Sequence, residues 1–228
     1  MRFTNQRGLV MVTGATGGIG SAVCQHLYKI RLSPLVCHRK NSTDKAAELA
    51  DKFGGISLPL DLGDAQSIDS AISLIKGMKE KFIGVVHCAS PSPHQAPLAQ
   101  VSEDDMEMFW KINVMGPRRL LAGIVKERLR KEREGVIVAI MSAAMGNWGA
   151  NAMPGLGAYT ISKFGLLGVL ALLEAENKWL RVVTVNPGFT RTGMLSAFDD
   201  RFIELACSQK PLAEPGEIAA DIVSQFEG

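Results

Sequence analysis

Two residues four positions apart, Tyr159 and Lys163, have side chains that could exchange a proton with a substrate. Positions i and i+4 of a helix share one face, so a helix here would hold the lysine ammonium beside the phenol. An unperturbed phenol has a pKa near ~10, and lowering it by ~3 units requires ~4 kcal/mol of phenolate stabilisation. A neighbouring ammonium in a partly dry site can supply much of that energy. Because the same spacing occurs in ordinary helices, the rest of the chain must support this interpretation.

A glycine-rich turn follows the first apolar run of the chain, residues 9–13. Glycines here let the backbone turn tightly and approach a bulky anion, while the N–H groups that open the next helix point toward a pyrophosphate. The spacing is G-x-x-x-G-x-G, so a tight strand-to-helix turn without a ligand is the alternative to a dinucleotide site. The expected cofactor contacts are Gly14, Thr16, Gly18, Ile19 and Gly20.

The end of the second expected strand indicates which dinucleotide fits. In dinucleotide-binding folds an acid binds the ribose hydroxyls of NAD, whereas an arginine accommodates the 2′-phosphate of NADP. Here the strand leads into Arg39 and a second cation, with no acid among them. Arg39 therefore favours NADP(H) over NAD(H), with solvated surface cations as the alternative. Further along, Asp61 with the Leu62 backbone could bind the adenine amino group, although Asp61 or Asp64 could equally start a helix.

Apolar runs alternate with helix-length segments along the chain, which predicts an α/β fold with right-handed crossovers and a parallel sheet. The 228 residues, 46% of them hydrophobic, suit a single NAD(P)-binding domain over residues 1–228. We expect a Rossmann-like doubly wound sheet of six or seven strands with helices on both faces. The expected strands are 9–13, 35–38, 56–60, 83–89, 136–141 and 182–186, and the expected helices are 19–30, 43–53, 65–79, 103–113, 118–132, 159–176, 202–208 and 216–225.

Charge and cysteine content argue against several classes of function. The net charge is +2 and acids are interspersed with the basic residues, so a nucleic-acid surface is not expected. The cysteines form no C-x-x-C motif and no cluster with histidine, which argues against a disulfide framework and a metal site and favours a reducing, cytoplasmic compartment. The N-terminus lacks the long apolar segment of a secretory signal. The four cysteines are Cys24, Cys37, Cys88 and Cys207.

Taken together and in order, these motifs resemble those of the short-chain dehydrogenase/reductase family, over nearly the whole chain. The resemblance implies an oxidoreductase in which Tyr159 is the general acid/base and Lys163 lowers its pKa and binds the nicotinamide ribose. It also implies that Ser142, at the end of the fifth expected strand, hydrogen-bonds the substrate oxygen, and that Asn113 holds a water in a proton relay. The run Asn186-Pro187-Gly188-Phe189-Thr190-Arg191-Thr192 matches as well, which places Pro187, Gly188, Thr190 and Thr192 beside the nicotinamide, with Thr192 reaching its amide or the pyrophosphate.

These roles also agree with the chemistry of the residues. Hydride transfer to a carbonyl develops negative charge on the oxygen, which requires a positioned donor and a proton source, and Ser142 with Tyr159 can supply both. For each residue there is a simpler alternative: Ser142 could satisfy a strand end, and Asn113 could end its helix before Pro117.

The chain departs from the family pattern in three places. The sequence stops at Gly228, where many relatives continue into a last strand, so we expect either a sheet one strand short or a truncated chain. Where the family usually has Asn-Asn-Ala-Gly after the fourth strand, this chain has His87-Cys88-Ala89-Ser90. Ala89 and Ser90 remain expected cofactor contacts, but Ser90 brings a Cβ and a hydroxyl to the place where bare backbone normally meets the adenosine ribose. Ser142 and Tyr159 are also further apart than is usual, which predicts an enlarged loop on the substrate side.

Three loops, 90–100, 143–158 and 189–212, are expected to surround the substrate. Their apolar side chains suit a ketone or an acyl group better than a sugar. We therefore expect NADPH-dependent reduction of a small or medium, mostly apolar ketone or 3-oxoacyl substrate. A non-catalytic NADP-binding regulator or dimeric scaffold with the same fold is the alternative. The apolar residues on which this rests include Trp148, Met153, Phe198, Phe202 and Leu205.

The apolar run 164–173 indicates whether the protein forms oligomers. It contains no polar side chain, and packing on the sheet can cover only one side of a helix, so we expect a homodimer or homotetramer through helices 103–132 and 159–176. Burial beneath the loop 143–158 is the alternative. The run itself is too short to span a membrane. Basic residues in 118–133 could dock an acidic acyl carrier protein, but interleaved glutamates favour a solvated helix.

Overall fold

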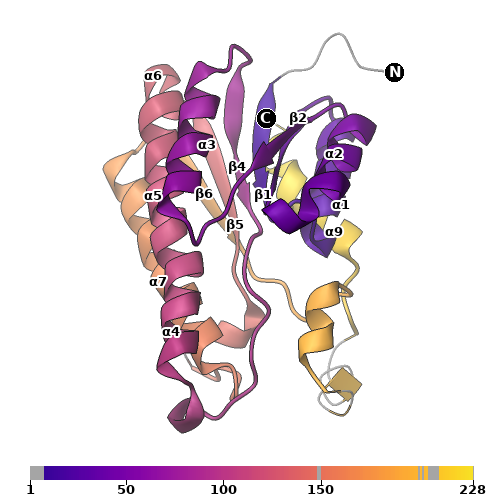
Figure 1. Cartoon of the computed structure of the whole chain (residues 1–228), viewed down its shortest axis with the longest axis vertical. Helices are drawn as coiled ribbons and strands as arrows, with labels where there is room; N and C mark the ends of the chain where they lie inside the picture. Colours follow the sequence, from indigo (N-terminus) through magenta and orange to yellow (C-terminus); the bar gives the residue numbers. More distant parts are fainter. Residues whose placement is uncertain (1–7, 148–149, 200, 202, 205–210, 228) are drawn as a thin grey trace.

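Six parallel strands form one sheet at the centre of the protein, in the order β3-β2-β1-β4-β5-β6. The structure is a computed structural model that describes residues 8–147, 150–199, 201, 203–204 and 211–227 (Figure 1). The expectation of a doubly wound parallel sheet is confirmed. Every residue of β1 is buried, as befits the strand with helices on both sides. The strands are β1 (Leu9–Thr13), β2 (Ser33–His38), β3 (Ile56–Pro59), β4 (Phe82–His87), β5 (Gly135–Ile140) and β6 (Leu180–Val185).

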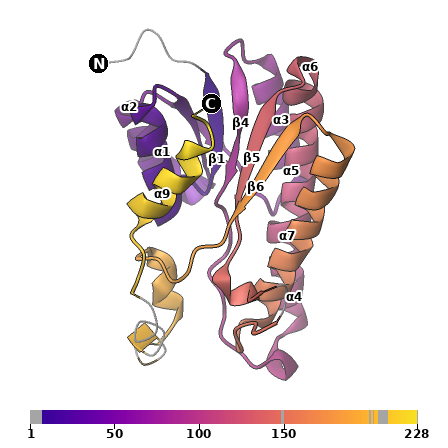
Figure 2. The same cartoon turned by 180° about the vertical axis from the view of Figure 1, so that it is seen from behind.

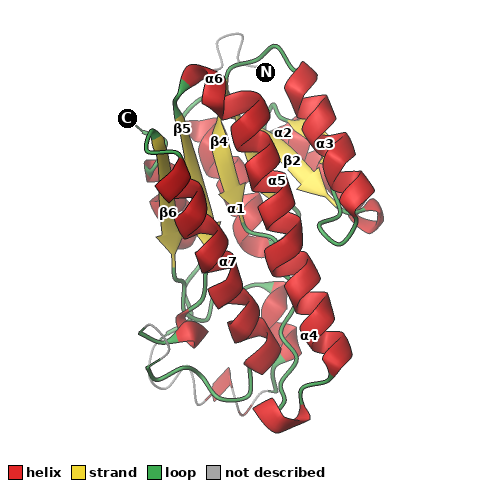
Figure 3. Ribbon diagram, turned by 90° about the vertical axis from the view of Figure 1, so that its left-hand side faces the viewer, coloured by secondary structure: helices red, strands yellow, loops and turns green. Residues whose placement is uncertain are grey.

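Helices cover both faces of the sheet (Figures 1 and 2). One face carries α1 (Gly18–Lys29), α2 (Thr43–Lys52) and α9 (Pro215–Ser224), with α1 packed along α9. The other face carries α3 (Ala65–Gly77), α7 (Gly157–Glu176) and one long helix between them in the chain, as Figure 3 shows. The long helix consists of α4 (Glu103–Trp110), η3 (Lys111–Met115), α5 (Gly116–Ile124), η4 (Val125–Leu129) and α6 (Arg130–Glu132). Short helical turns are η1 (Lys40–Ser42), η2 (Leu98–Gln100), η5 (Ala143–Met145) and η6 (Gly193–Ala197).

The hydrophobic core has one half on each face because side chains alternate along a strand. Met11, Val85 and Ile137 point toward α3, α5 and α7. Val12 and Val138 point toward α1, α2 and α9. This alternation fixes which side chains at the strand ends face the layer that contains α7.

The chain from Glu103 to Glu132 is continuous helix, whereas the sequence predicted two helices separated at residues 114–117. The difference arises at η3, a π turn in which the N–H of Gly116 donates to the carbonyl of Lys111. Pro117 follows at the start of α5, where its missing N–H interrupts no regular α-helical bond. The π turn therefore absorbs the proline and keeps Asn113 inside the helix.

Helix α7 is longer than its apolar run. The whole helix has 20 residues and a mean hydropathy of 1.4, enough by length and composition to cross a membrane, but core helices of globular proteins meet the same criterion. Leu166 and Leu170 pack in the core, and the helix also buries the polar side chains of Ser162 and Lys163. This is the pattern of a core helix in a globular fold. Of the sequence expectations, most of the helix at 202–208, with Phe202, Leu205 and Cys207, and also Trp148, lies outside the described residues.

Candidate active site

The loops that leave the carboxyl ends of β1 and β4 meet at the point where the sheet order reverses. Thr13 and His87 are register partners at the ends of these two strands. The N–H of Ala89 donates to Thr13 Oγ1 at 3.2 Å, which joins the loop after β4 to β1. In open α/β sheets ligands bind in the crevice at this reversal point. The expected nucleotide loop and the expected catalytic residues lie at this edge of the sheet.

The glycine-rich loop has a shape that only glycine allows. Gly14 has φ +64°, and a Cβ there would lie 2.9 Å from the backbone of Ala89. A Cβ on Gly20 would lie 2.3 Å from the carbonyl oxygen of Gly14, and one on Gly18 would lie 2.5 Å from the Thr192 methyl. The loop is thus pressed against the segments that follow β4 and β6. Thr16 and Ile19, in the same loop, are partly exposed.

Helix α1 begins in this loop without a side-chain cap at Gly17 and without an acid in its first turn. The first N–H groups of a helix lack partners within the helix and carry a partial positive charge. An uncapped start without acids suits an anionic ligand, so the loop fits the pyrophosphate of a dinucleotide.

Tyr159 and Lys163 lie one helical turn apart near the start of α7, as their spacing predicted. Both are buried, with 7% and 2% of their surface exposed, and the Lys163 Nζ lies 5.6 Å from the centre of the Tyr159 ring. The ammonium donates to the carbonyl oxygen of Ile140, the last residue of β5, at 2.8 Å. The phenol and the ammonium therefore share one pocket between α7 and the end of the sheet.

Burial shifts the pKa values of both groups away from charge. It lowers the pKa of Lys163 to about 8, and the nearby Cys88 thiol opposes this shift. It raises the pKa of Tyr159, which a hydrogen bond with the Ser142 side chain partly offsets. The sequence suggested a lowered phenol pKa, whereas in the structure desolvation is the largest cause and raises it. A pKa of Tyr159 below its ordinary value therefore requires a further positive charge close to the phenol oxygen.

Ser142 lies just beyond β5, where its hydroxyl accepts a hydrogen bond from the N–H of Ala144 at 3.1 Å and caps the turn η5. The hydroxyl can still donate its proton, because this bond uses only a lone pair. With Tyr159 close enough to hydrogen-bond, the two hydroxyls can converge on one substrate oxygen.

Asn113 is fully buried in the π turn η3, and its amide joins three segments. Its Nδ2 donates to Ser90 Oγ at 3.1 Å and to Ser162 Oγ at 3.0 Å. Ser162 in turn donates to the carbonyl oxygen of Tyr159 at 2.7 Å. Sequence reasoning missed Ser162, although its position three residues after Tyr159 was the available signal. The amide thus ties the loop after β4 to the helix that carries Tyr159 and Lys163.

The outer cofactor contacts expected from the sequence follow the ends of β2 and β3. Arg39 is exposed directly after β2. Asp64 proves to be the residue that caps α3, accepting from the N–H of Gln66 at 3.0 Å. Asp61 stays exposed before it, with one carboxylate oxygen bonded to the N–H of Gly63 at 2.8 Å, and Leu62 is buried.

The segment after β6 closes the other side of the crevice. The carbonyl of Pro187 accepts from the N–H of Ala143 at 3.1 Å, which joins this segment to the turn after Ser142. Thr190 is buried and donates to the carbonyl of Gly188 at 3.1 Å. Thr192 caps η6 through its hydroxyl and meets the glycine loop through its methyl.

The family model of the short chain dehydrogenases matches residues 8–201. The chain belongs to the short-chain dehydrogenase family. It is 26% identical to oxidoreductase UcpA of Salmonella typhimurium, over 94% of this chain and 86% of that one. It is also 26% identical to 3-oxoacyl-[acyl-carrier-protein] reductase FabG of Vibrio harveyi, over 94% and 88%. An alcohol dehydrogenase of the archaeon Thermococcus sibiricus, solved in complex with 5-hydroxy-NADP, shares its fold with a TM-score of 0.81 at 20% identity, over 97% of this chain and 91% of that one.

This short-chain dehydrogenase is therefore an oxidoreductase of a family that binds NAD(P)(H), and its carboxyl-edge crevice is the place where a dinucleotide would lie. Its departures from the family pattern are accommodated locally. The Ser90 hydroxyl, which replaces a hydrogen atom of glycine, is used by Asn113 and by the carbonyl of Pro91. Both hydrogen bonds of Ser90 are made to residues other than those of the glycine loop.

An apolar cluster surrounds the Tyr159 ring of this short-chain dehydrogenase. Phe109 of α4 meets that ring edge-on, with ring centres 6.1 Å apart. Met153 of the enlarged loop and Phe198 after η6 pack against the same cluster. Phe109 was not predicted from the sequence, since one aromatic residue within an amphipathic helix gives no signal of its own.

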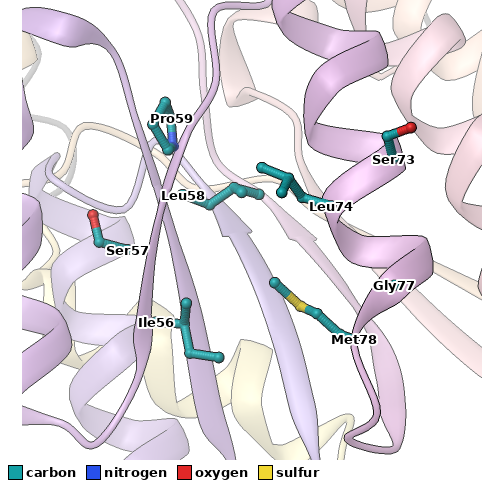
Figure 4. Close-up of a pocket in the computed structure, with 8 residues that line it drawn as sticks. All are labelled: Ile56, Ser57, Leu58, Pro59, Ser73, Leu74, Gly77 and Met78. Carbon is teal, nitrogen blue, oxygen red and sulfur yellow. The ribbon is translucent and has the colours of Figure 1, made fainter.

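The rest of the described structure contains a groove but no candidate metal site. Within the described residues no group of three His, Cys, Asp or Glu side chains is arranged to hold a metal ion. A groove of about 480 Å³ lies between β3 and α3, lined by Ile56, Leu58, Leu74 and Met78 among others (Figure 4). It is mostly apolar and contains none of the site residues, so it belongs to the edge of the sheet rather than to the crevice.

Proposed function

We propose that this protein is an NADPH-dependent reductase that delivers hydride to the carbonyl carbon of a small or medium, mostly apolar ketone or 3-oxoacyl compound. The observation that carries the proposal is the buried pair of Tyr159 and Lys163, 5.6 Å apart from ring centre to Nζ, beside Ser142. A phenol and an ammonium buried together, at the same sheet edge as a glycine loop, supply a proton source next to a nucleotide crevice.

The cofactor would be held at both of its ends. The glycine loop and the start of α1 would receive the pyrophosphate, and Lys163 would hydrogen-bond the nicotinamide ribose. The bound dinucleotide supplies the hydride, and the protein supplies orientation and charge. The residues assigned to cofactor binding are Gly14, Thr16, Gly18, Ile19, Gly20, Arg39, Asp61, Leu62, Ala89, Ser90, Tyr159, Lys163, Pro187, Gly188, Thr190 and Thr192.

In the reaction, the hydroxyls of Ser142 and Tyr159 bind the carbonyl oxygen as it gains negative charge. The Tyr159 proton moves to that oxygen, and the Lys163 ammonium stabilises the phenolate that is left. Asn113 keeps α7 in register with the loop after β4, so the phenol stays at the mouth of the crevice. The proton would return to Tyr159 from solvent, along a relay in which Asn113 holds a water beside Lys163.

The preference for NADP(H) over NAD(H) follows from Arg39. This exposed guanidinium at the end of β2 stands where a dinucleotide fold meets the ribose 2′ position, and a guanidinium binds phosphate through two parallel hydrogen bonds.

An apolar substrate follows from the cluster of Phe109, Met153 and Phe198 around Tyr159. The 3-oxoacyl class is supported by the similarity to the Vibrio harveyi reductase. Docking of an acyl carrier protein is less well supported, because Arg119 is paired with Asp69 and Arg128 bonds three backbone carbonyls. We therefore favour a free small-molecule substrate, bounded by loops 90–100, 143–158 and 189–212.

The protein is also proposed to assemble as a homodimer through helices 103–132 and 159–176. Trp110, Met115, Ile161 and Leu172 are large apolar side chains on these helices that are more than a third exposed. Exposed apolar side chains gathered on two adjacent helices are typical of a subunit interface. The free thiols of Cys24, Cys37 and Cys88 support a reducing, cytoplasmic location.

Oxidation of NADPH in the presence of a panel of aliphatic, aromatic and 3-oxoacyl ketones tests the proposal. Tyr159→Phe should lower the rate by about 10²–10⁴-fold, as for loss of a general acid. The matched control is Tyr28→Phe, at the other tyrosine of the chain, on α1 with its ring 6.0 Å from that of Phe53. If the wild-type protein binds NADPH but reduces no ketone, a non-catalytic NADP-binding regulator or scaffold replaces the reductase.

A further inference from the structure

His87, at the last position of β4, is a buried histidine that the reaction described above does not use. Its register partners are Thr13 on β1 and Ala139 on β5. No part of it is exposed, and its Nδ1 lies 2.9 Å from the hydroxyl oxygen of Thr13. Its Nε2 is buried and has no hydrogen-bond partner. A buried polar atom left unpaired is costly, so the position of Nε2 calls for an explanation.

The imidazole faces the same layer as Lys163. Val85, two residues before His87 on β4, belongs to the half of the core that packs against α5 and α7, as does Ala139 beside it. Ile140, next to Ala139, accepts the hydrogen bond from Lys163. The two buried side chains therefore lie in the same layer, between the strand ends and α7. The Lys163 charge is close enough to lower the pKa of His87.

The environment of the ring favours its neutral form. Burial, together with the Lys163 charge, lowers the pKa of His87 to about 3. A neutral imidazole has one N–H donor and one bare nitrogen that accepts. Thr13 Oγ1 already accepts from the N–H of Ala89 at 3.2 Å and has a second lone pair for Nδ1–H. With the proton on Nδ1, the lone pair of Nε2 would face the layer that holds the Lys163 charge, an arrangement that electrostatics favours.

We propose that His87 is a positioning residue for Lys163: its Nδ1–H is fixed by Thr13, and its bare Nε2 accepts a hydrogen bond from a water that the Lys163 ammonium donates to. This inference deepens the proposed function, since it concerns the lysine assigned there to phenolate stabilisation. The link runs from β1, at the start of the nucleotide loop, through the imidazole to α7. It stabilises the ammonium form of Lys163 against the cost of burial.

Two substitutions separate this role from a merely structural one. The side-chain amide of glutamine reaches the place of Nε2, whereas that of asparagine reaches only the place of Nδ1. His87→Gln keeps an acceptor toward Lys163, and His87→Asn keeps only the contact with Thr13. Asparagine is also the residue that the family usually has here, so His87→Asn is expected to fold. Thermal unfolding of both variants checks that they do.

The readout is the titration of the Lys163 side chain in the protein without nucleotide, followed by NMR of isotope-labelled lysine and assigned with Lys163→Arg. His87→Gln should leave the wild-type midpoint unchanged. His87→Asn should lower it by about one pH unit, as for loss of one hydrogen bond to a charged group. An unchanged midpoint in both variants, or a shift in His87→Gln alone, would overturn the proposal.

A second measurement needs no variant at the site. The ¹⁵N shifts of the His87 ring in the wild-type protein report which nitrogen carries the proton, and the proposal requires it on Nδ1. A proton on Nε2 would overturn it. Neither measurement depends on turnover, so a protein that reduces no ketone would refute the proposed function while leaving the role of His87 to be decided by these titrations.

Discussion

The Nζ atom of Lys163 lies 2.8 Å from the carbonyl oxygen of Ile140, so the buried ammonium is anchored to the end of β5. Its charge acts on the Tyr159 ring from 5.6 Å. Lys163 therefore has a structural role as well as its proposed catalytic one, because it links the end of β5 to the site. Keeping it there costs stability, because burial disfavours the charged form.

The first prediction is that the stability difference between the wild-type protein and Lys163→Met depends on pH. The pKa of Lys163 is lowered from 10.5 to about 8 in the folded protein. Between these values the unfolded chain binds more protons than the folded one, so the wild type gains stability as the pH rises. Urea unfolding should show its stability rising by about 3 kcal/mol relative to the variant across this window.

Below pH 8 the difference should be constant, because the lysine is protonated in both states. The control is Lys45→Met, at an exposed lysine of α2, which should show no such dependence. A flat difference between the wild type and Lys163→Met over the whole range would contradict the buried, shifted ammonium.

The sequence predicted the parts of this site that depend on local pattern. The strand at Leu9–Thr13, the glycine loop and the helical pairing of Tyr159 with Lys163 are all set by residues near one another in the chain. The end of the helix at Asn113 was predicted wrongly, because a π turn that absorbs Pro117 has no signature in hydrophobic period.

Contacts between distant segments could not be read in the same way. Asn113 meets Ser90 and Ser162, which lie 23 and 49 residues away in the chain. Such contacts exist only once β4, η3 and α7 are packed together, and no spacing rule encodes them. The same holds for His87, whose partner Thr13 lies 74 residues away. Sequence therefore predicted the local pairing of Tyr159 with Lys163 better than the contacts that hold these residues in place.

The second prediction concerns Arg39. Arg39→Ala removes the guanidinium proposed to bind the 2′-phosphate and should weaken NADPH binding by about 10–100-fold, as for loss of charge-assisted hydrogen bonds. NADH binding should change little. Fluorescence titration with both nucleotides measures this, and Arg118→Ala, at an exposed arginine of α5, is the control. An equal loss for NADH and NADPH would count against the assignment of Arg39.

The third prediction concerns the proposed dimer. Leu172 on α7 is 63% exposed, so a glutamate there costs the monomer little but would place a charge in an apolar interface. Leu172→Glu should convert a dimer to monomers at micromolar concentration in sedimentation velocity. Leu74→Glu is the matched control, since Leu74 is 57% exposed on α3, in the groove beside β3. A wild-type monomer, or a dimer that survives Leu172→Glu, would argue against this interface.

The last prediction concerns Arg128, which holds the end of α3 to the long helix. Its guanidinium donates to the carbonyl oxygens of Ile75 and Met78 at 2.7 and 2.5 Å, and to that of Glu80 at 2.6 Å. A lysine ammonium is a point charge without the planar fork that spans three carbonyls. Arg128→Lys should therefore destabilise the protein by about 2 kcal/mol in urea unfolding. Arg130→Lys, two residues on and exposed, should change stability by less than about 0.5 kcal/mol. Equal effects at the two positions would mean that the carbonyl contacts of Arg128 contribute nothing to the fold.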